Sequence, residues 1–148
     1  MAIEIEDRVK QFIEAHRVAH LATSDAAGNP SVIPICYIFD GAAFYSAIDD
    51  KPKRLVPNQL QRIRNIRANP RVALLIDDYS EDWSELAYVL IRGIAGIIEP
   101  DGSSATEHAR AIATLRVKYA QYRSMTIEQH PMIRIVPDRV HFWSAVPS

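Results

Sequence analysis

An Asp-Gly dipeptide, Asp40-Gly41, stands between two apolar runs and constrains the fold of this chain more than any other feature. This dipeptide between apolar runs is the strongest short-range hairpin signal, because a tight two-residue turn needs residues that tolerate positive φ angles. The runs at residues 31–39 and 42–48 are therefore predicted to be antiparallel strands. Pro34 removes one hydrogen-bond donor from the first strand, which places it at an edge, a bulge or a surface that faces a ligand.

The rest of the chain predicts more strands, with few helices between them. Apolar or alternating runs bounded by turn residues predict strands at residues 17–24, 71–77, 86–98, 132–136 and 140–143. Apolar residues at helical spacing predict three helices, at residues 4–16, 57–69 and 104–122. In the last helix, Ser104 and Glu107 have the spacing of a capping box. A doubly wound parallel sheet would need a helix between most strands. The pattern instead favours a mainly β fold, an antiparallel barrel of six to seven strands with about three peripheral helices.

Length and composition indicate an ordinary globular protein. The 148 residues fit a single domain, and a chain that is 48% hydrophobic and 24% charged is neither disordered nor membrane-embedded. No apolar segment approaches the roughly 18 residues that a membrane span requires. The net charge of -1 argues against nucleic acid as the main partner. Cys36, the one cysteine, is consistent with a reducing compartment, so we expect a cytoplasmic protein with neither a membrane nor a nucleic-acid partner.

The usual catalytic and metal-binding motifs are missing from the sequence. It contains no GxSxG, HExxH, CxxC or GxxxxGK pattern. The histidines have no metal-ligand spacing, although His20 and His141 lie in predicted strands that could bring them together. The acidic residues at 77–82 are interpreted as an exposed loop, and Cys36 as an unreactive core residue. We therefore expect no metal site, and no catalytic side chain is identified.

A basic cluster follows the strand predicted at residues 42–48. It consists of Lys51, Lys53 and Arg54, and the next helix adds Arg62, Arg64 and Arg67, which lie off its apolar stripe. A run of charges is usually a solvated face. A cationic turn at the exit of a strand also suits a phosphate group, because charge-assisted hydrogen bonds are about twice as strong as neutral ones. In a barrel with aromatic residues, this cluster indicates a phosphorylated, partly apolar cofactor whose own ring carries the chemistry.

Three segments in this order resemble a known family. They are AHLATSDAAGNPSVIPICYIF, the strand end FYS followed by KPKR, and RNIRANPRVALL. Together they resemble the FMN-binding split-barrel superfamily that includes pyridoxamine 5′-phosphate oxidase, over about residues 8–145. The stretch from KPKR to DWSEL is similar to the branch of probable deazaflavin (coenzyme F-420)-dependent enzymes. The resemblance implies a split β-barrel, a homodimer with cofactor sites at the subunit interface, and an oxidoreductase that transfers a hydride to a small unsaturated substrate.

The resemblance also implies a set of cofactor-binding residues. Carried over by position, these are Ser31, Val32, Ile33, Pro34 and Ile35 along the ring, Tyr45 and Ser46 at the ribityl chain, Lys51, Lys53 and Arg54 at the phosphate, and Tyr88 and Trp143 beside the ring. Arg62, Arg64 and Arg67 could extend the contact along the anionic tail of coenzyme F-420. The chain ends at Ser148 without the basic segment that the oxidases use for their substrate phosphate, so pyridoxamine phosphate oxidation is not expected.

Three alternatives stay open at this point. FMN could occupy the same pocket, and for FMN the cluster at residues 51–54 would suffice. A non-enzymatic cofactor-binding or haem-binding protein of the same fold would use His20 or His141 as the iron ligand. Nucleic-acid binding through residues 51–67 is the least favoured alternative. The basic charge is confined to this segment, and the net charge of the chain is -1.

Overall fold

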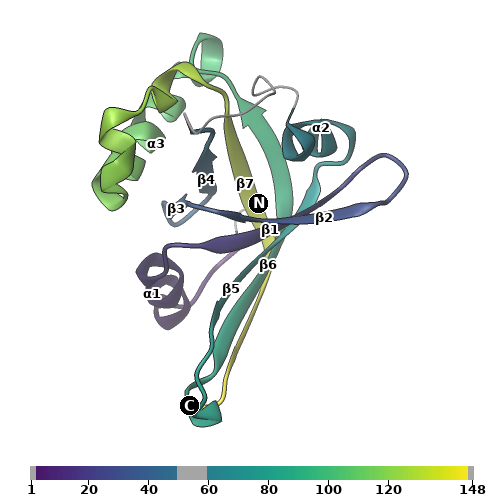
Figure 1. Cartoon of the computed structure of the whole chain (residues 1–148), viewed down its shortest axis with the longest axis vertical. Coiled ribbons are helices and arrows are strands. Elements are labelled where there is room, and N and C mark those ends of the chain that lie inside the picture. The colour runs from purple at the N-terminus through teal and green to yellow at the C-terminus, as the bar shows by residue number, and fades with distance from the viewer. Residues whose placement is uncertain (1–2, 50–59, 147–148) are drawn as a thin grey trace.

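A computed structural model describes residues 3–49 and 60–146, and these residues form one antiparallel sheet with helices around it (Figure 1). The strands are β1 (Ala19–Ser24), β2 (Pro30–Ile35), β3 (Ile38–Phe39), β4 (Phe44–Ala47), β5 (Arg71–Asp78), β6 (Ala87–Ile98) and β7 (Met132–Ser144). The α-helices are α1 (Asp7–Ala15), α2 (Gln61–Ala68) and α3 (Ala105–Lys118), and the short 3-10 helices are η2 (Trp83–Glu85), η3 (Gly102–Ser104), η4 (Ala120–Ser124) and η5 (Ile127–Gln129). The strand order β2-β1-β5-β6-β7-β4-β3, with every pair antiparallel, confirms the predicted mainly β fold.

The sheet curls into a half-barrel, and its two hydrophobic cores set which face of each strand is buried. The larger core lies inside the curl, where Leu21 and Leu74 from the strands meet Ile13 of α1 and Ile63 of α2. The second core lies where α3 packs on β4 and β7, and Leu115 and Met132 are fully buried there. In Figure 1, α1 and α3 lie on the left of the sheet and α2 at its upper right. The side of β2, β1, β5, β6 and β7 that faces away from the larger core is called the outer face.

The strand predicted at residues 31–39 is interrupted at Cys36 and Tyr37, which separate β2 from β3. The Tyr37 N–H donates to the Tyr119 hydroxyl at 3.0 Å instead of to a strand, and the Tyr37 hydroxyl donates to the backbone oxygen of Ile13. These bonds satisfy polar groups that would otherwise be buried alone. The break therefore turns this part of the chain toward the α3 end of the molecule.

The two strands predicted at the end of the chain are one continuous strand, β7, and this prediction was wrong. Gly93 pairs with Pro137 and Arg92 pairs with Arg139, so Asp138 is the extra residue of a bulge. A bulge tolerates a proline that a regular ladder would not. A Cβ on Gly93 would lie 2.5 Å from the Val136 oxygen, so glycine lets β6 and β7 approach at the bulge.

The capping box predicted for α3 does not form, because Ser104 makes no side-chain cap bond. Glu107 instead accepts hydrogen bonds from the Tyr45 hydroxyl at 2.5 Å and from Nη1 of Arg134 at 2.9 Å. Hydrogen bonds from a charged guanidinium and a phenol stabilise a half-buried carboxylate more than a hydrogen bond from a solvated backbone N–H does. These bonds lower the pKa of Glu107, chiefly through Tyr45, and they tie α3 to β4 and β7.

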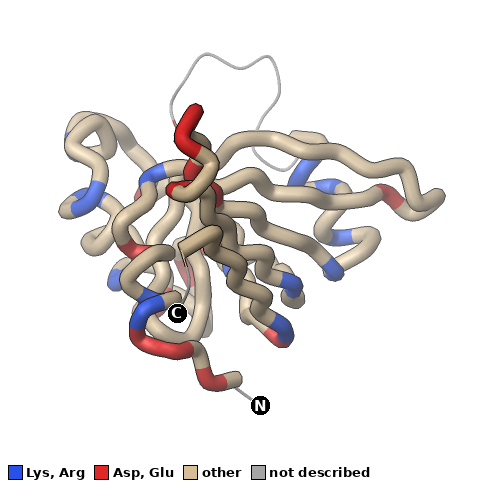
Figure 2. The backbone as a smooth tube through the Cα atoms, turned by 90° about the horizontal axis from the view of Figure 1, so that it is seen from below, with Lys and Arg blue, Asp and Glu red and all other residues tan. Residues whose placement is uncertain are grey.

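Figure 2 marks the basic and acidic positions along the backbone of the described residues. Arg92 and Arg139 lie opposite each other on β6 and β7, and both are exposed. None of the described helices has the length and apolar character needed to cross a membrane.

Candidate functional site

A cavity of about 320 Å³ opens where β2 ends, and we call it the arginine cavity. Its lining residues are Val18, Pro34, Ile35, Cys36, Ser46, Ala47, Asp49, Arg62 and Tyr122. Three of the residues predicted to bind a cofactor, Pro34, Ile35 and Ser46, therefore lie together here. The volume is at the lower end of the range for small-molecule pockets, about 300–1,000 Å³.

Helix α2 brings Arg62 to this cavity because two asparagines dock the helix on β1. The buried Asn65 donates from Nδ2 to the Thr23 hydroxyl at 3.0 Å, and Asn69 donates to the Ser24 hydroxyl at 2.8 Å. Ile63 and Ile66 anchor the same helix in the larger core. Paired polar groups and packed side chains fix the rotation of α2, and thereby the direction of Arg62.

The guanidinium of Arg62 is the chemical feature that distinguishes the arginine cavity. Its Nε is buried and has no hydrogen-bond partner among the described residues. Burial lowers the pKa of Arg62, and the nearby Asp49 acts in the opposite direction. Buried donors are nearly always paired, and an arginine stays protonated in proteins. A phosphate oxygen would supply the missing acceptor, so the residues present fit the anionic arm of a flavin-type cofactor.

The other basic residues of the prediction do not join Arg62 in the cavity lining. Arg64 is exposed and donates to Gln61 in its own helix, and Arg67 pairs with Glu99 at 3.7 Å. The structure therefore gives α2 one cavity-facing arginine instead of three. Lys51, Lys53 and Arg54 lie outside the described residues.

The remaining predicted residues of β2 and β4 are placed elsewhere. Ser31 and Ile33 are opposite Thr23 and Leu21 on the inner side of the sheet, whereas Val32 is 63% exposed on the outer face. Tyr45 is buried in the second core and donates to Glu107. Burial there raises the pKa of Tyr45, so this phenol is a structural hydrogen-bond donor and does not line the arginine cavity.

Tyr88 and Trp143 form an aromatic platform on the outer face. Their rings stack with centroids 5.8 Å apart, and they line a shallow cavity of about 340 Å³ together with Leu75 and Tyr79. Trp143 is 42% exposed, so it is not a core aromatic. Three strand spacings separate β2 from β6, about 14 Å along the sheet. One chain therefore divides the predicted residues between two locations.

The two candidate haem ligands are also separated. His20 and His141 share one row of the outer face through the pairs His20–Leu75, Leu75–Leu90 and Leu90–His141. Three strand spacings again lie between them, about 14 Å, so one chain does not bring both to the same iron. Within residues 3–49 and 60–146, no group of three or more His, Cys, Asp or Glu side chains could hold a metal ion.

Sequence reasoning missed the role of Cys36 and Tyr122 at this site. Cys36 was expected to be an unreactive core residue, but it is partly exposed and lines the arginine cavity. The buried Tyr122 lines the same cavity. Burial raises the pKa of Tyr122, with smaller contributions from Cys36 and Asp49. No pattern in the sequence links residue 36 to residue 122, because their contact depends on how η4 folds back.

Comparison with known proteins places this fold in a family. The family model described as pyridoxamine 5'-phosphate oxidase matches residues 5–144, and the chain therefore belongs to that family. No curated protein sequence is similar enough to be matched.

Three solved structures illustrate the range of similar proteins. An F420 reductase is 22% identical with a TM-score of 0.63, and the match covers 93% of this chain and 98% of the other. An FAD-binding protein from Mesorhizobium loti is 21% identical with a TM-score of 0.67, covering 91% and 89%. HutZ, the heme storage protein from Vibrio cholerae, is 16% identical with a TM-score of 0.69, covering 96% and 95%. At these identities the likeness establishes the shared fold.

Proposed function

We propose that this protein is an oxidoreductase that binds a flavin-type cofactor in the arginine cavity, with coenzyme F-420 as that cofactor. The observation that carries the proposal is the buried, unpartnered Nε of Arg62 beside the end of β2. A pocket with one fixed cation and mostly apolar walls suits a ligand with an anionic arm and a flat ring. Membership in the oxidase family and the flavin-type cofactors named for similar structures support the same class of ligand.

Each part of the cavity has a proposed role. Arg62 would bind the phosphate, with Lys51, Lys53 and Arg54 adding charge from the preceding segment. Backbone groups at Pro34 and Ile35 would line the ring, and the Ser46 hydroxyl would meet the ribityl chain. When bound, the deazaflavin ring supplies two-electron hydride chemistry. The protein would contribute position and charge compensation, with no side chain required as a nucleophile.

FMN is the second candidate, and one observation favours it. Arg64 and Arg67 face away from the cavity, so α2 does not extend the basic contact along a polyglutamate tail. The sequence from KPKR to DWSEL favours coenzyme F-420 instead. Equilibrium fluorescence titration of the purified protein with each cofactor separates the two. We expect tighter binding of coenzyme F-420. Micromolar or tighter binding of FMN with none of coenzyme F-420 would reverse the assignment.

We further propose that two copies associate through the outer face of the sheet. This face carries Val32 on β2, Leu75 on β5 and Trp143 on β7, and all three are at least 36% exposed. Exposed apolar groups that gather on one face indicate an interaction site. A second copy would also bring the aromatic platform of one chain toward the arginine cavity of the other, uniting residues that a single chain separates.

Sedimentation equilibrium tests this association. The wild-type protein is expected to be a dimer, and Leu75→Glu is expected to be monomeric because it buries a charge at the interface. Val117→Glu on α3 is the control, since Val117 is exposed away from this face. A monomeric wild type, or a Leu75→Glu variant that remains a dimer, would contradict the proposal.

A further inference from the structure

A second cavity, of about 550 Å³, adjoins the arginine cavity, and we call it the tyrosine cavity. Its lining residues are Arg17, Val18, Cys36, Asp49, Tyr119, Gln121, Tyr122 and Met125. Val18, Cys36, Asp49 and Tyr122 line both cavities, so the two spaces meet. The proposed cofactor function uses the first cavity and leaves the second without a role.

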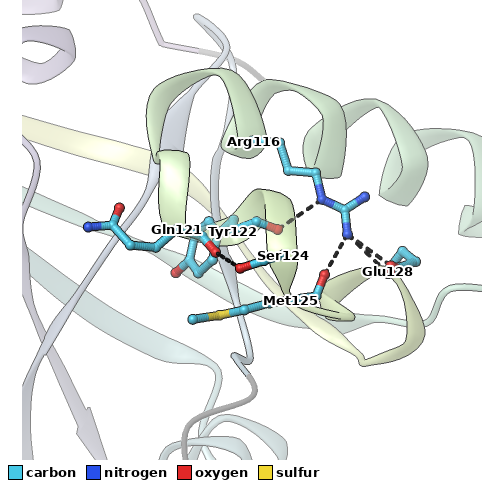
Figure 3. Close-up of polar contacts among 6 residues, drawn as sticks. All are labelled: Arg116, Gln121, Tyr122, Ser124, Met125 and Glu128. Atoms are coloured by element: carbon cyan, nitrogen blue, oxygen red, sulfur yellow. Dashed lines mark hydrogen bonds and ion pairs between the residues drawn. The ribbon is translucent and has the colours of Figure 1, made fainter.

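One wall of the tyrosine cavity is formed by the 3-10 helix η4 and Met125 after it, and Arg116 of α3 holds this wall in place (Figure 3). Arg116 donates from Nε to the Tyr122 oxygen at 3.1 Å and from Nη2 to the Met125 oxygen at 2.7 Å. The same Nη2 lies 2.8 Å from Oε1 of Glu128, which fixes the guanidinium from the other side. In Figure 3, the side chains of Gln121, Tyr122 and Met125 point away from Arg116. One arginine therefore holds the backbone of a wall whose side chains face the cavity.

The back of the cavity is equally well defined. The Tyr119 hydroxyl lies 2.8 Å from the Arg17 oxygen and 2.9 Å from the Tyr37 oxygen, and it accepts a bond from the Tyr37 N–H. Arg17 donates to the Lys118 oxygen and lies over the Tyr119 ring, with 5.7 Å between its Cζ and the ring centroid. These contacts hold Arg17 against the C-terminal end of α3.

The chemistry of this lining selects a class of ligand. Val18, Met125 and the two tyrosine rings supply apolar contacts, and methionine and aromatic side chains pack well against flat rings. Gln121 is exposed and offers an amide at the rim. Arg17 and Asp49, the two charged residues of this lining, both have other partners. The lining therefore favours an uncharged, flat, largely apolar molecule with one polar end.

We propose that the tyrosine cavity binds the uncharged, flat substrate of this protein, and that Arg116 is the positioning residue for its wall. The proposal rests on the proposed function for the role of this ligand as a substrate. The existence of the site rests on the cavity and on the bonds of Arg116 alone. Arg116 would act through the Tyr122 and Met125 backbone and would not touch the ligand.

Binding of N-phenyl-1-naphthylamine, an uncharged naphthyl fluorophore, to the full chain without cofactor tests the proposal. We expect saturable binding with a blue-shifted emission. Met125→Trp should abolish saturable binding by filling the cavity. Gln121→Trp, a change at an exposed position, is the second filling variant in case Met125→Trp does not fold. No saturable binding by the wild type, or unchanged binding in a folded filling variant, would overturn the site.

Substitutions of Arg116 test its positioning role. Arg116→Met should weaken probe binding by about tenfold or more, since the wall loses both backbone hydrogen bonds. Arg116→Lys, which can still donate to these carbonyls, should recover binding to within about threefold of the wild type. Arg110→Met makes the same change at an exposed position of α3 and should have no effect. Unchanged probe binding in Arg116→Met, or no recovery in Arg116→Lys, would overturn the positioning role.

Cofactor titration of the same variants separates this proposal from the proposed function. Arg116→Met should weaken cofactor binding less than probe binding, because only Tyr122 of its two backbone partners lines the arginine cavity. An equal loss of cofactor and probe binding would mean that Arg116 supports the whole fold, which contradicts the positioning role. If the wild-type protein bound the probe but neither cofactor, the proposed function would be refuted and the proposal of a ligand site in the tyrosine cavity would remain.

Discussion

Replacement of Arg62 by methionine should separate ligand binding from stability. Methionine keeps an unbranched apolar chain in the same space and removes the guanidinium. A hydrogen bond to a charged group contributes about 1.5–3 kcal/mol, so loss of the bond to a phosphate should weaken cofactor binding about 10-fold to 150-fold. The free energy of unfolding should stay within about 1 kcal/mol, because Nε gives up no hydrogen bond in the described structure and the apolar contacts persist.

Two measurements on the same protein check this prediction. Fluorescence titration with coenzyme F-420 and with FMN gives the affinity, and urea denaturation gives the free energy of unfolding. Arg64→Met is the matched control, since Arg64 lies in the same helix, is exposed and does not line the cavity. The control should change the affinity by less than about twofold. If Arg62→Met bound as tightly as the wild type, the phosphate would not be at Arg62 and the assignment of the cavity would fail.

Two further predictions concern the fold around the site. Gly93→Ala should destabilise the protein by about 1–3 kcal/mol, because its Cβ would meet the Val136 backbone, whereas Gly96→Ala has open space and should be tolerated. Equal urea midpoints for the two variants would contradict the bulge geometry. Stability should also fall as the pH rises from 10 to 12. Burial raises the pKa of Tyr119 to about 12. The Tyr119 hydroxyl therefore loses its proton at a lower pH in the unfolded chain than in the folded protein, which favours unfolding as the pH rises. The loss from this side chain should be at most about 1.4 kcal/mol per pH unit, since only one proton is released. A flat profile in urea denaturation over this range would contradict the buried hydroxyl.

The strands and helices were largely predictable because each has a strong local pattern. The hairpin at Asp40-Gly41, the stripe of Ile63 and Ile66, and the apolar run of β5 each correspond to an element of the structure. The errors came where long-range contacts override local signals. No local sequence pattern shows that the Tyr119 hydroxyl accepts a hydrogen bond from the Tyr37 N–H. Likewise, none shows that Glu107 accepts a hydrogen bond from Tyr45 instead of capping its own helix.

The site was predictable in part, and Arg62 shows where a signal was available. At about 100° per residue, Arg62 lies within about 60° of Asn65 and 40° of Ile66 on the helical wheel, whereas Arg64 lies on the far side. Asn65 and Ile66 are both buried, so Arg62 lies at the edge of the buried stripe. The tyrosine cavity had no such signal, because it depends on how the short 3-10 helix η4 folds back, where Arg116 holds it in place.

The most direct test of the cofactor assignment compares each cofactor with its form that lacks the phosphate arm. The wild-type protein is titrated with coenzyme F-420 and with the same deazaflavin ring and ribityl chain without the phosphate, and then with FMN and riboflavin. If Arg62 binds the anionic arm, the phosphorylated form of the preferred pair should bind at least about tenfold more tightly. Equal affinity of the two forms in both pairs would contradict the claim that this cavity binds a flavin-type cofactor through its phosphate.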